Sequence, residues 1–220
     1  MTGLSIFDLD RTITRQGTWT PWLIFWARRE APWRLALLPV AAFAGVAYLL
    51  GMISRARLKE AGQRLLMGDG IPRARVESVA VAYAARILAV NVFPKALERL
   101  VAERVEGRRI VIATASCEFY VVALAARLGV ADVIGTRSVW NGDRLRARLD
   151  GDNCYGVAKL RRIEAWLAEH GLDEVPFRFF SDHVSDMPVF ERAAECIATT
   201  PSPKLRAVAV ARGWTIIDWS

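Results

Sequence analysis

The sequence predicts an α/β fold built from one core and one insertion. Along residues 108–200, short apolar runs alternate with amphipathic stretches at helical spacing, a rhythm typical of βαβ units and a Rossmann-like parallel sheet. A further apolar run at residues 4–9 is separated from these by a long helical stretch. We therefore expect residues 1–16 and 92–220 to form the core and residues 17–91 to form an inserted all-helical cap.

The individual elements follow from the same pattern. Residues 4–9 are a short apolar run that ends in carboxylates, as expected of a buried parallel strand whose carboxyl end faces a site. Asn141-Gly142 lies between two short runs with strand character, which predicts a β-hairpin flap. Nothing between Thr14 and Val92 has convincing strand character. The remaining core elements are expected to be helices at residues 95–107, 118–129 and 155–170, and strands at residues 108–114, 132–135, 177–182, 195–200 and 214–219.

Charge and cysteine content narrow the classes of partner. The 220 residues include 30 Lys and Arg against 23 Asp and Glu, a formal charge of +7 that favours nucleic acid, acidic lipid or phosphorylated small molecules. The basic residues are spread through the cap and hairpin rather than set among stacking aromatics, so no nucleic-acid partner is expected. The three cysteines form no CxxC pair, which argues against a zinc site or a disulfide framework: Cys117, Cys154 and Cys196.

The first residues and the cysteine content indicate in which cellular compartment the protein is expected. The first residues, MTGLSIFDLD, enter a strand pattern directly, without the basic and apolar regions of a secretory leader. The cysteine usage also suits a reducing environment. We therefore expect the catalytic part to lie in the cytoplasm.

Two pairs of carboxylates stand at predicted strand ends. Asp8 and Asp10 lie where the first strand gives way to a loop, and two carboxylates this close suit a divalent cation, with one able to attack an electrophile while the other moves protons. Asp182 ends another apolar strand, and Asp186 follows four residues later. The carboxyl ends of parallel strands converge on one edge, where ligands bind. The alternatives are a solvated acidic loop for the first pair and a helix cap for Asp186.

A hydroxyl and an ammonium are expected at the same edge. Thr114 ends the strand IVIAT, and Lys159 lies near the start of a helix. Together they could hold phosphate oxygens and neutralise charge as it develops. Either residue alone would carry little weight, so the argument depends on the order of all four elements along the chain.

That order resembles a known family. DLDRT, IVIATAS, the lysine of NCYGVAK, and FFSDHVSD are similar to the four motifs of the haloacid dehalogenase superfamily of phosphatases, and the resemblance covers essentially the whole chain. In detail the chain resembles the subclass whose helical cap follows the first motif, which includes the phosphoserine phosphatases. The resemblance implies a phosphomonoester substrate and a Mg²⁺ cofactor.

The same resemblance implies a role for each motif residue. Asp8 would be the nucleophile that forms an aspartyl-phosphate, and Asp10 the general acid to the leaving alcohol and then the base for water. Mg²⁺ would be held by Asp8, the backbone carbonyl of Asp10 and Asp182. The residues that support the metal shell or bind the phosphoryl group would be Asp186, Thr114 and Lys159.

Three departures from the subclass affect these expectations. Arg11 stands where many relatives have a small residue, and is either a cation beside the nucleophile or a surface arginine. Phosphoserine phosphatases carry an acidic residue a few positions past the first motif, but the corresponding stretch here, ITRQGTW, has none. Where they have a small Gly-rich turn after the second motif, this chain has ATASCEF. Free phosphoserine is therefore an unattractive substrate, since its ammonium would lack a carboxylate partner.

Residues 35–53 form an apolar run without a charge, long enough for a transmembrane helix candidate. Asp8 precedes this run and the other motifs follow it, so a single crossing would place the two halves of one active site on opposite sides of the membrane. A two-crossing hairpin lacks a second span. The run is therefore expected to lie in the membrane interface, or to be buried within the cap or against a second subunit, with Pro39 as a potential kink.

The flanks favour the interface over the cap core or a homodimer surface. Arginines and tryptophans border the apolar run, as in segments that lie on anionic membranes. The layout also resembles that of the HAD-type phosphatidylglycerophosphatases, which implies a lipid phosphate substrate and a peripheral position on the inner face of the cell membrane. The alternative is a soluble phosphatase of small metabolites, similar to the enzymes for phosphoserine or histidinol phosphate. A regulatory protein with a phosphatase-like core is disfavoured because no motif residue is missing.

Overall fold

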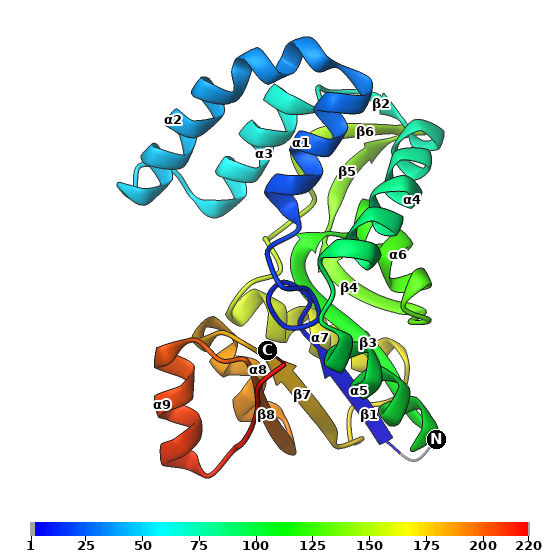
Figure 1. Ribbon diagram of the computed structural model, residues 1–220, viewed down its shortest axis with the longest axis vertical. Coiled ribbons are helices and arrows are strands. Elements are labelled where there is room, and N and C mark those ends of the chain that lie inside the picture. Colours follow the sequence, from blue (N-terminus) through cyan, green and yellow to red (C-terminus); the bar gives the residue numbers. More distant parts are fainter. Residues whose placement is uncertain (1–2, 220) are drawn as a thin grey trace.

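The centre of the molecule is a six-stranded, all-parallel sheet. The structure is a computed structural model that describes residues 3–219. The strand order is β4-β3-β1-β7-β8-β9, so the first strand of the chain lies in the middle of the sheet (Figure 1). This confirms the predicted α/β class. The strands are β1 (Gly3–Phe7), β3 (Arg108–Cys117), β4 (Asp132–Thr136), β7 (Phe177–Ser181), β8 (Glu195–Thr199) and β9 (Thr215–Ile217).

Both faces of this sheet are covered, which explains why its strands are continuous apolar runs. Ile6 and Phe7 point to opposite faces and are both fully buried. One face packs against α7 (Val157–Glu169), α8 (Met187–Arg192) and α9 (Pro203–Arg212). The other packs against α5 (Pro94–Val105) and α6 (Glu118–Arg127).

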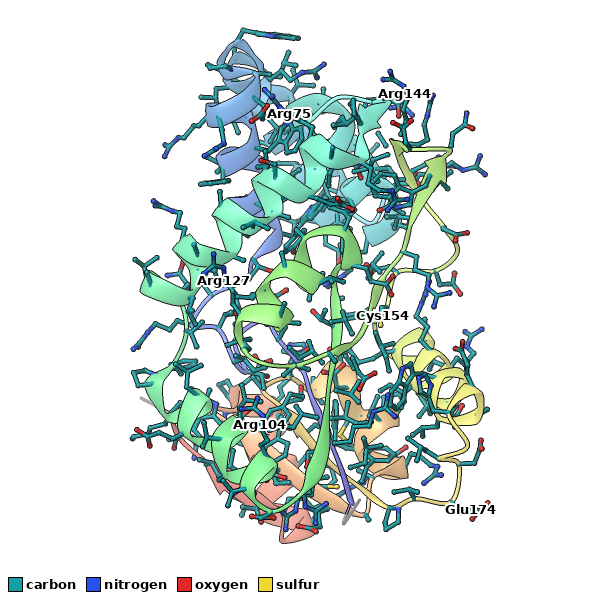
Figure 2. The ribbon with its side chains drawn as sticks, turned by 90° about the vertical axis from the view of Figure 1, so that its right-hand side faces the viewer. Arg75, Arg104, Arg127, Arg144, Cys154 and Glu174 are labelled. Atoms are coloured by element: carbon teal, nitrogen blue, oxygen red, sulfur yellow. The ribbon has the colours of Figure 1, made fainter. Side chains whose placement is uncertain are left out.

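The cap lies beyond the carboxyl ends of the central strands and is mainly helical. It contains α1 (Trp19–Glu30), a 3₁₀ segment η1 (Pro32–Leu37), α2 (Leu38–Leu49), α3 (Arg55–Leu66) and α4 (Arg73–Val90). These helices form the upper half of the molecule in Figure 1. Figure 2 places Arg75 and Arg144 at this end, and Arg104 and Glu174 at the opposite end.

A small antiparallel sheet completes the cap. The hairpin strands β5 (Ser138–Asn141) and β6 (Arg144–Leu149) pair with β2 (Ile71–Pro72), in the order β2-β6-β5. Gly142 has φ of 60° in the hairpin turn, as the Asn-Gly pair predicts. The expectation of no strand between Thr14 and Val92 is wrong for these two residues of β2. A two-residue strand has no sequence period, and this one exists because Ile71 pairs with Leu145.

Cap and core share one hydrophobic interior. α4 packs along α6, the helix that directly follows β3 (Figure 2). The ring of Trp22 from α1 stacks on that of Tyr120 from α6, with centroids 5.0 Å apart, and Tyr83 from α4 meets both rings edge-on. Aromatic pairs add to the stabilisation from buried area. The cap is therefore anchored to the core through α1, α4 and α6.

The apolar run is exposed rather than buried. η1 and α2 contain no buried residue, and α2 packs mainly on α3 and η1, projecting at the edge of the cap (Figure 1). Phe43 is 74% exposed and Leu49 is 81% exposed. The interpretation of this run as a buried cap core is therefore wrong. Pro39 lies in the first turn of α2, where a proline is tolerated, and α2 is not broken there. By length and composition, Pro32–Leu49 is the one candidate membrane span within residues 3–219.

Candidate active site

The predicted acidic residues gather at the carboxyl edge of the sheet. β1 and β7 are neighbours, so Asp8 and Asp182, which follow them, lie side by side. Both border a cavity of about 360 Å³ between cap and core. Asp10, Lys159 and Asp186 border the same cavity. The strand order changes direction at this point, and α/β proteins bind ligands at such a switch point.

Lys159 ties two of these carboxylates together. Its Nζ lies 2.9 Å from Asp8 Oδ1 and 2.8 Å from Asp186 Oδ2, and the side chain is 2% exposed. Burial alone would lower the pKa of Lys159, but the two carboxylates outweigh it and hold the pKa above its usual range. Gly156 precedes α7 with φ of 58°, a backbone conformation that favours glycine. Lys159 of α7 reaches the carboxylate of Asp186 in η2 (Val184–Asp186).

The site holds more negative charge than Lys159 alone offsets. Burial raises the pKa of Asp8 to about 8, with added repulsion from Asp186 and Asp182 and opposition from Lys159. Burial and Asp186 raise the pKa of Asp182 to about 6. The second oxygen of Asp186, Oδ1, is buried without a hydrogen-bond partner. A buried cluster of carboxylates with an unpaired oxygen fits a bound divalent cation, which would supply the missing positive charge.

The donor set suits Mg²⁺. Thr12 Oγ1 lies 3.5 Å from Asp8 Oδ2 and 3.4 Å from Asp182 Oδ1, so the two carboxylates flank one hydroxyl. Within residues 3–219, no three side chains of His, Cys, Asp or Glu form a metal-binding group. The set implied by the family resemblance is smaller than such a group, with side chains from Asp8 and Asp182 and a backbone carbonyl from Asp10. Oxygen donors from one or two carboxylates, completed by water, are typical of Mg²⁺.

Asp10 has a different environment from Asp8. Its Oδ1 accepts hydrogen bonds from the backbone N–H and the hydroxyl of Thr18, each at 2.8 Å, and its Oδ2 accepts from the Ser116 hydroxyl at 2.7 Å. The Thr18 hydroxyl also contacts Tyr120 Oη at 2.9 Å, and Tyr83 Oη donates to the Thr18 carbonyl at 2.7 Å. Asp10 is thus held by hydrogen bonds from neutral donors at the junction of cap and core, and within residues 3–219 no cation forms an ion pair with it.

Thr114 lies outside the cavity lining, and Arg11 lies at the border of the cavity. Thr114 is fully buried near the end of β3, where its Oγ1 accepts from the Ser116 N–H at 3.0 Å, and Ala115 rather than Thr114 lines the cavity. Arg11 is exposed and borders the cavity, so it lies beside the acidic groups as well as on the surface. Its φ of 64° lies in the left-handed region, where residues other than glycine are uncommon.

Several residues that border or support the site carry no sequence signal. Arg55, at the start of α3, lines the cavity from the cap; its guanidinium lies 4.0 Å from the ring centroid of Tyr155 and donates to Tyr48 Oη at 3.1 Å. Trp219 Nε1 donates to the Thr12 carbonyl at 2.7 Å and so fixes the loop after β1 from the other end of the chain. Only three-dimensional proximity identifies these contacts.

This fold and arrangement of residues define a class of hydrolase, and comparison with known proteins agrees. Residues 6–191 match the haloacid dehalogenase-like hydrolases, and the chain belongs to this family of enzymes. A probable phosphatase of Mycobacterium tuberculosis is 25% identical over 217 residues, which cover 98% of this chain and 75% of the relative.

Solved structures share the architecture. A Bordetella pertussis protein of unknown function superposes with a TM-score of 0.87 at 25% identity, covering 99% of this chain and 98% of the other. A phosphoserine phosphatase, determined as a phospho-aspartyl intermediate analogue, superposes with a TM-score of 0.64 at 17% identity, covering 100% of this chain and 94% of the other. At 17% identity, the match to the phosphoserine phosphatase supports a shared fold and nothing more specific.

Proposed function

We propose that this protein hydrolyses phosphomonoesters through an aspartyl-phosphate on Asp8, with Mg²⁺ as cofactor. The observation that supports this most is the placement of Lys159 between Asp8 and Asp186, beside Asp182, in one cavity at the sheet edge. An ammonium among carboxylates at the mouth of a parallel sheet suits the positioning and charge neutralisation that phosphoryl transfer requires.

In the proposed reaction, Asp8 and Asp10 have different roles. A carboxylate oxygen of Asp8 forms a bond to phosphorus as the bond from phosphorus to the leaving oxygen breaks, and Asp10 gives that oxygen its proton. Water then attacks the phosphorus of the aspartyl-phosphate, Asp10 takes a proton from that water, and phosphate leaves as Asp8 is restored. Lys159 neutralises charge on the phosphoryl oxygens. Thr114, the other expected phosphate-binding residue, does not line the cavity and would act indirectly, through the Ser116 N–H that its hydroxyl accepts.

The distribution of neighbours supports this division. Asp8 has a cation 2.9 Å away that favours its charged form, as a nucleophile requires. Within residues 3–219, the hydrogen bonds that Asp10 accepts come from neutral donors, which orient its carboxyl group. The residues that would hold Mg²⁺ are Asp8, the carbonyl of Asp10 and Asp182, with Asp186 as their support. When bound, the ion offsets negative charge on the carboxylates and the phosphoryl group.

The cations that remain favour an anionic leaving group. Arg11 and Arg55 border the cavity, and neither forms an ion pair with a carboxylate among residues 3–219. A second anion on the substrate, beyond the reacting phosphate, would complement them. An ammonium or imidazolium group, as in phosphoserine or histidinol phosphate, would find no carboxylate in the cavity except those of the reaction centre.

We further propose that the substrate is a lipid phosphate, such as phosphatidylglycerophosphate, presented at the inner face of the cell membrane. Arg55 donates to Tyr48 in the last turn of α2, so the cavity and the exposed apolar helix meet at this arginine. A headgroup could then reach the cavity while α2 contacts the acyl region. This arrangement supports an amphiphilic phosphomonoester over a small soluble one.

A soluble metabolite phosphatase is the alternative, favoured by the similarity in fold to a phosphoserine phosphatase. In that case the exposed face of α2 would be a homodimer surface. Sedimentation velocity would detect such a dimer, and sedimentation with anionic liposomes would detect the membrane contact.

A substrate panel tests the proposal. Mg²⁺-dependent phosphate release would be measured with phosphatidylglycerophosphate, phosphatidate, phosphoserine and histidinol phosphate. We expect preference for a lipid, and a loss of activity on the order of 10⁴-fold in Asp8→Asn. Preference for a soluble compound would reject the lipid substrate but keep the chemistry. Activity that survives in Asp8→Asn would reject the chemistry itself, and Asp152→Asn, at an exposed loop aspartate, is the matched control.

A further inference from the structure

We propose that a groove between α1 and α4 is a second binding site, for a single-chain amphiphile with a phosphate-type anionic headgroup. The groove has a volume of about 690 Å³, larger than the catalytic cavity. The two helices contact each other in the cap, on the side where both run down to the core (Figure 1). No residue lines both cavities, so the groove is a separate site and the inference does not depend on the proposed reaction.

The walls of the groove are apolar. Ile24 and Phe25 from α1 line the groove together with Tyr83, Ile87 and Val90 from α4. The volume lies within the range typical of small-molecule sites, which are mostly apolar with a few placed polar groups. A hydrocarbon chain would remove the partly exposed Ile24 and Phe25 and the exposed Val90 from water and gain the corresponding hydrophobic stabilisation.

The polar groups of the groove are cationic. Four arginines line it, and none of the described residues that line it is acidic. Arg28 and Arg86 have no acidic partner among residues 3–219, whereas Arg29 lies 3.6 Å from Glu30 and Arg15 lies over the ring of Phe93. Uncompensated guanidinium groups beside an apolar wall repel one another and attract an anion. Arginine also binds phosphate oxygens in a bidentate manner, which favours a phosphate-type headgroup.

The shape of the surface distinguishes this ligand from a membrane. α2 presents a projecting apolar ridge, which suits contact with a broad surface. The groove is concave, and its apolar side chains and arginines line the same volume, so a single amphiphile would contact both. The observations therefore favour a single bound molecule over a lipid bilayer.

The groove also lies at the junction of cap and core. Gln16 and Asn91 are on the two chain segments that join cap and core, and they are paired by hydrogen bonds of 3.1 and 3.2 Å. Both residues line the groove. Tyr83, on its wall, donates to the Thr18 carbonyl, and Thr18 holds Asp10. A bound molecule would thus touch the support of Asp10 without entering the catalytic cavity.

Binding of decylphosphonate tests the site, because its carbon–phosphorus bond is not a phosphoester. Calorimetry on the full chain, with the probe below its micelle concentration, is expected to give about one equivalent bound, and at least tenfold weaker binding in Arg28→Ala/Arg86→Ala. Arg55→Ala, in the catalytic cavity, is expected to have no effect. The matched surface control is Arg148→Ala/Arg161→Ala, which removes two exposed arginines elsewhere.

Simpler probes separate the two parts of the ligand. Methylphosphonate and decanol should each bind at least tenfold more weakly than decylphosphonate, and circular dichroism verifies that the variants are folded. Equal affinity of methylphosphonate would reduce the groove to a cationic patch and reject the proposal. So would unchanged binding in Arg28→Ala/Arg86→Ala, no binding at all, or a loss in Arg55→Ala that places the probe in the catalytic cavity.

Discussion

At the scale of single residues, the two carboxylates of the first motif differ because of their neighbours. Asp8 is buried against Lys159, whereas Asp10, two positions later, accepts hydrogen bonds from Thr18 and Ser116. The same functional group therefore meets a cation in one case and neutral donors in the other. This contrast underlies the proposed division into nucleophile and acid-base, since environment rather than residue type sets such roles.

The raised pKa of Asp8 predicts how stability depends on pH without added Mg²⁺. Burial raises this pKa from 3.8 to about 8, so the folded protein binds more protons than the unfolded chain between these values. The free energy of unfolding is therefore expected to fall as the pH rises through this range, with Asp182 contributing up to about 6. Urea unfolding in a chelator at both ends of the range measures this.

Two comparisons complete the pH experiment. Asp8→Asn should flatten the profile, because the amide does not titrate. Added Mg²⁺ should restore stability at the alkaline end, because a bound cation favours the charged carboxylates. A free energy of unfolding that rises with pH in the chelator would contradict the assignment of the charge cluster.

Lys59 illustrates a residue with a structural task beside the site. It is 7% exposed, donates to the Ala115 carbonyl and lies 2.6 Å from Asn153 Oδ1, and burial lowers its pKa. Lys59→Met removes this charged donor and leaves the two acceptors to share the single Thr136 hydroxyl, so the free energy of unfolding should fall by about 1–3 kcal/mol. Arg57→Met, exposed on the same helix, should change it by less than about 0.5 kcal/mol. Equal effects in urea titrations of the two variants would contradict this account.

At the scale of elements, α2 is the exception to the usual amphipathic pattern. Surface helices pair one apolar stripe with a polar face, but α2 is apolar on all sides and has no buried residue. α3 instead alternates basic and apolar positions and buries Leu66 and Gly62. An exposed apolar element of this size marks an interaction surface.

Charges introduced on α2 test its contact with membranes. Phe43→Asp/Leu49→Asp is expected to reduce co-sedimentation with anionic liposomes at least tenfold, because a carboxylate is costly to bury in lipid and is repelled by anionic headgroups. Hydrolysis of p-nitrophenyl phosphate should be retained, since neither residue lines the catalytic cavity.

The control for α2 uses equally exposed valines of the core. Val101 and Val105 on α5 are 53% and 82% exposed, and Val101→Asp/Val105→Asp should leave liposome binding unchanged. Equal loss in both variants would indicate a general charge effect. No loss in the α2 variant would reject the membrane contact.

At the scale of the whole molecule, cap and core form one cooperative unit. Trp22, Tyr83 and Tyr120 belong to a single buried cluster that also contains Phe7 of the central strand. We therefore expect a single urea transition, with coincident midpoints by tryptophan fluorescence and far-UV circular dichroism. Trp22→Ala should lower the free energy of unfolding by about 3–5 kcal/mol. Trp33→Ala, at a side chain 66% exposed, should have an effect below about 0.5 kcal/mol.

Independent unfolding of the cap would contradict a single urea transition. Two separate transitions, of which Trp22→Ala shifts only one, would mean that the cap unfolds independently of the sheet. The shared aromatic cluster would then contribute to the cap alone.

The sequence by itself determined the class of fold and its family. Strand and helix periods, an Asn-Gly turn and carboxylates at the ends of apolar runs are local patterns, and the parallel sheet then brings Asp8 and Asp182 to one edge. Lys159 and Asp186 could be placed there for the same reason. β2 could not be predicted, because two residues carry no period and Ile71 is a strand only through its partner Leu145.

The tertiary structure decided what surrounds the reaction centre. Thr18 and Ser116 hold Asp10 from positions 8 and 106 residues away, and Trp219 supports Thr12 across 207 residues. Composition could not show whether residues 35–53 are buried, because apolar residues are found both in hydrophobic cores and at exposed membrane or protein interfaces. The groove of Arg28 and Arg86 likewise exists only where α1 meets α4. Contacts between residues distant in sequence depend on how helices pack, which no local pattern records.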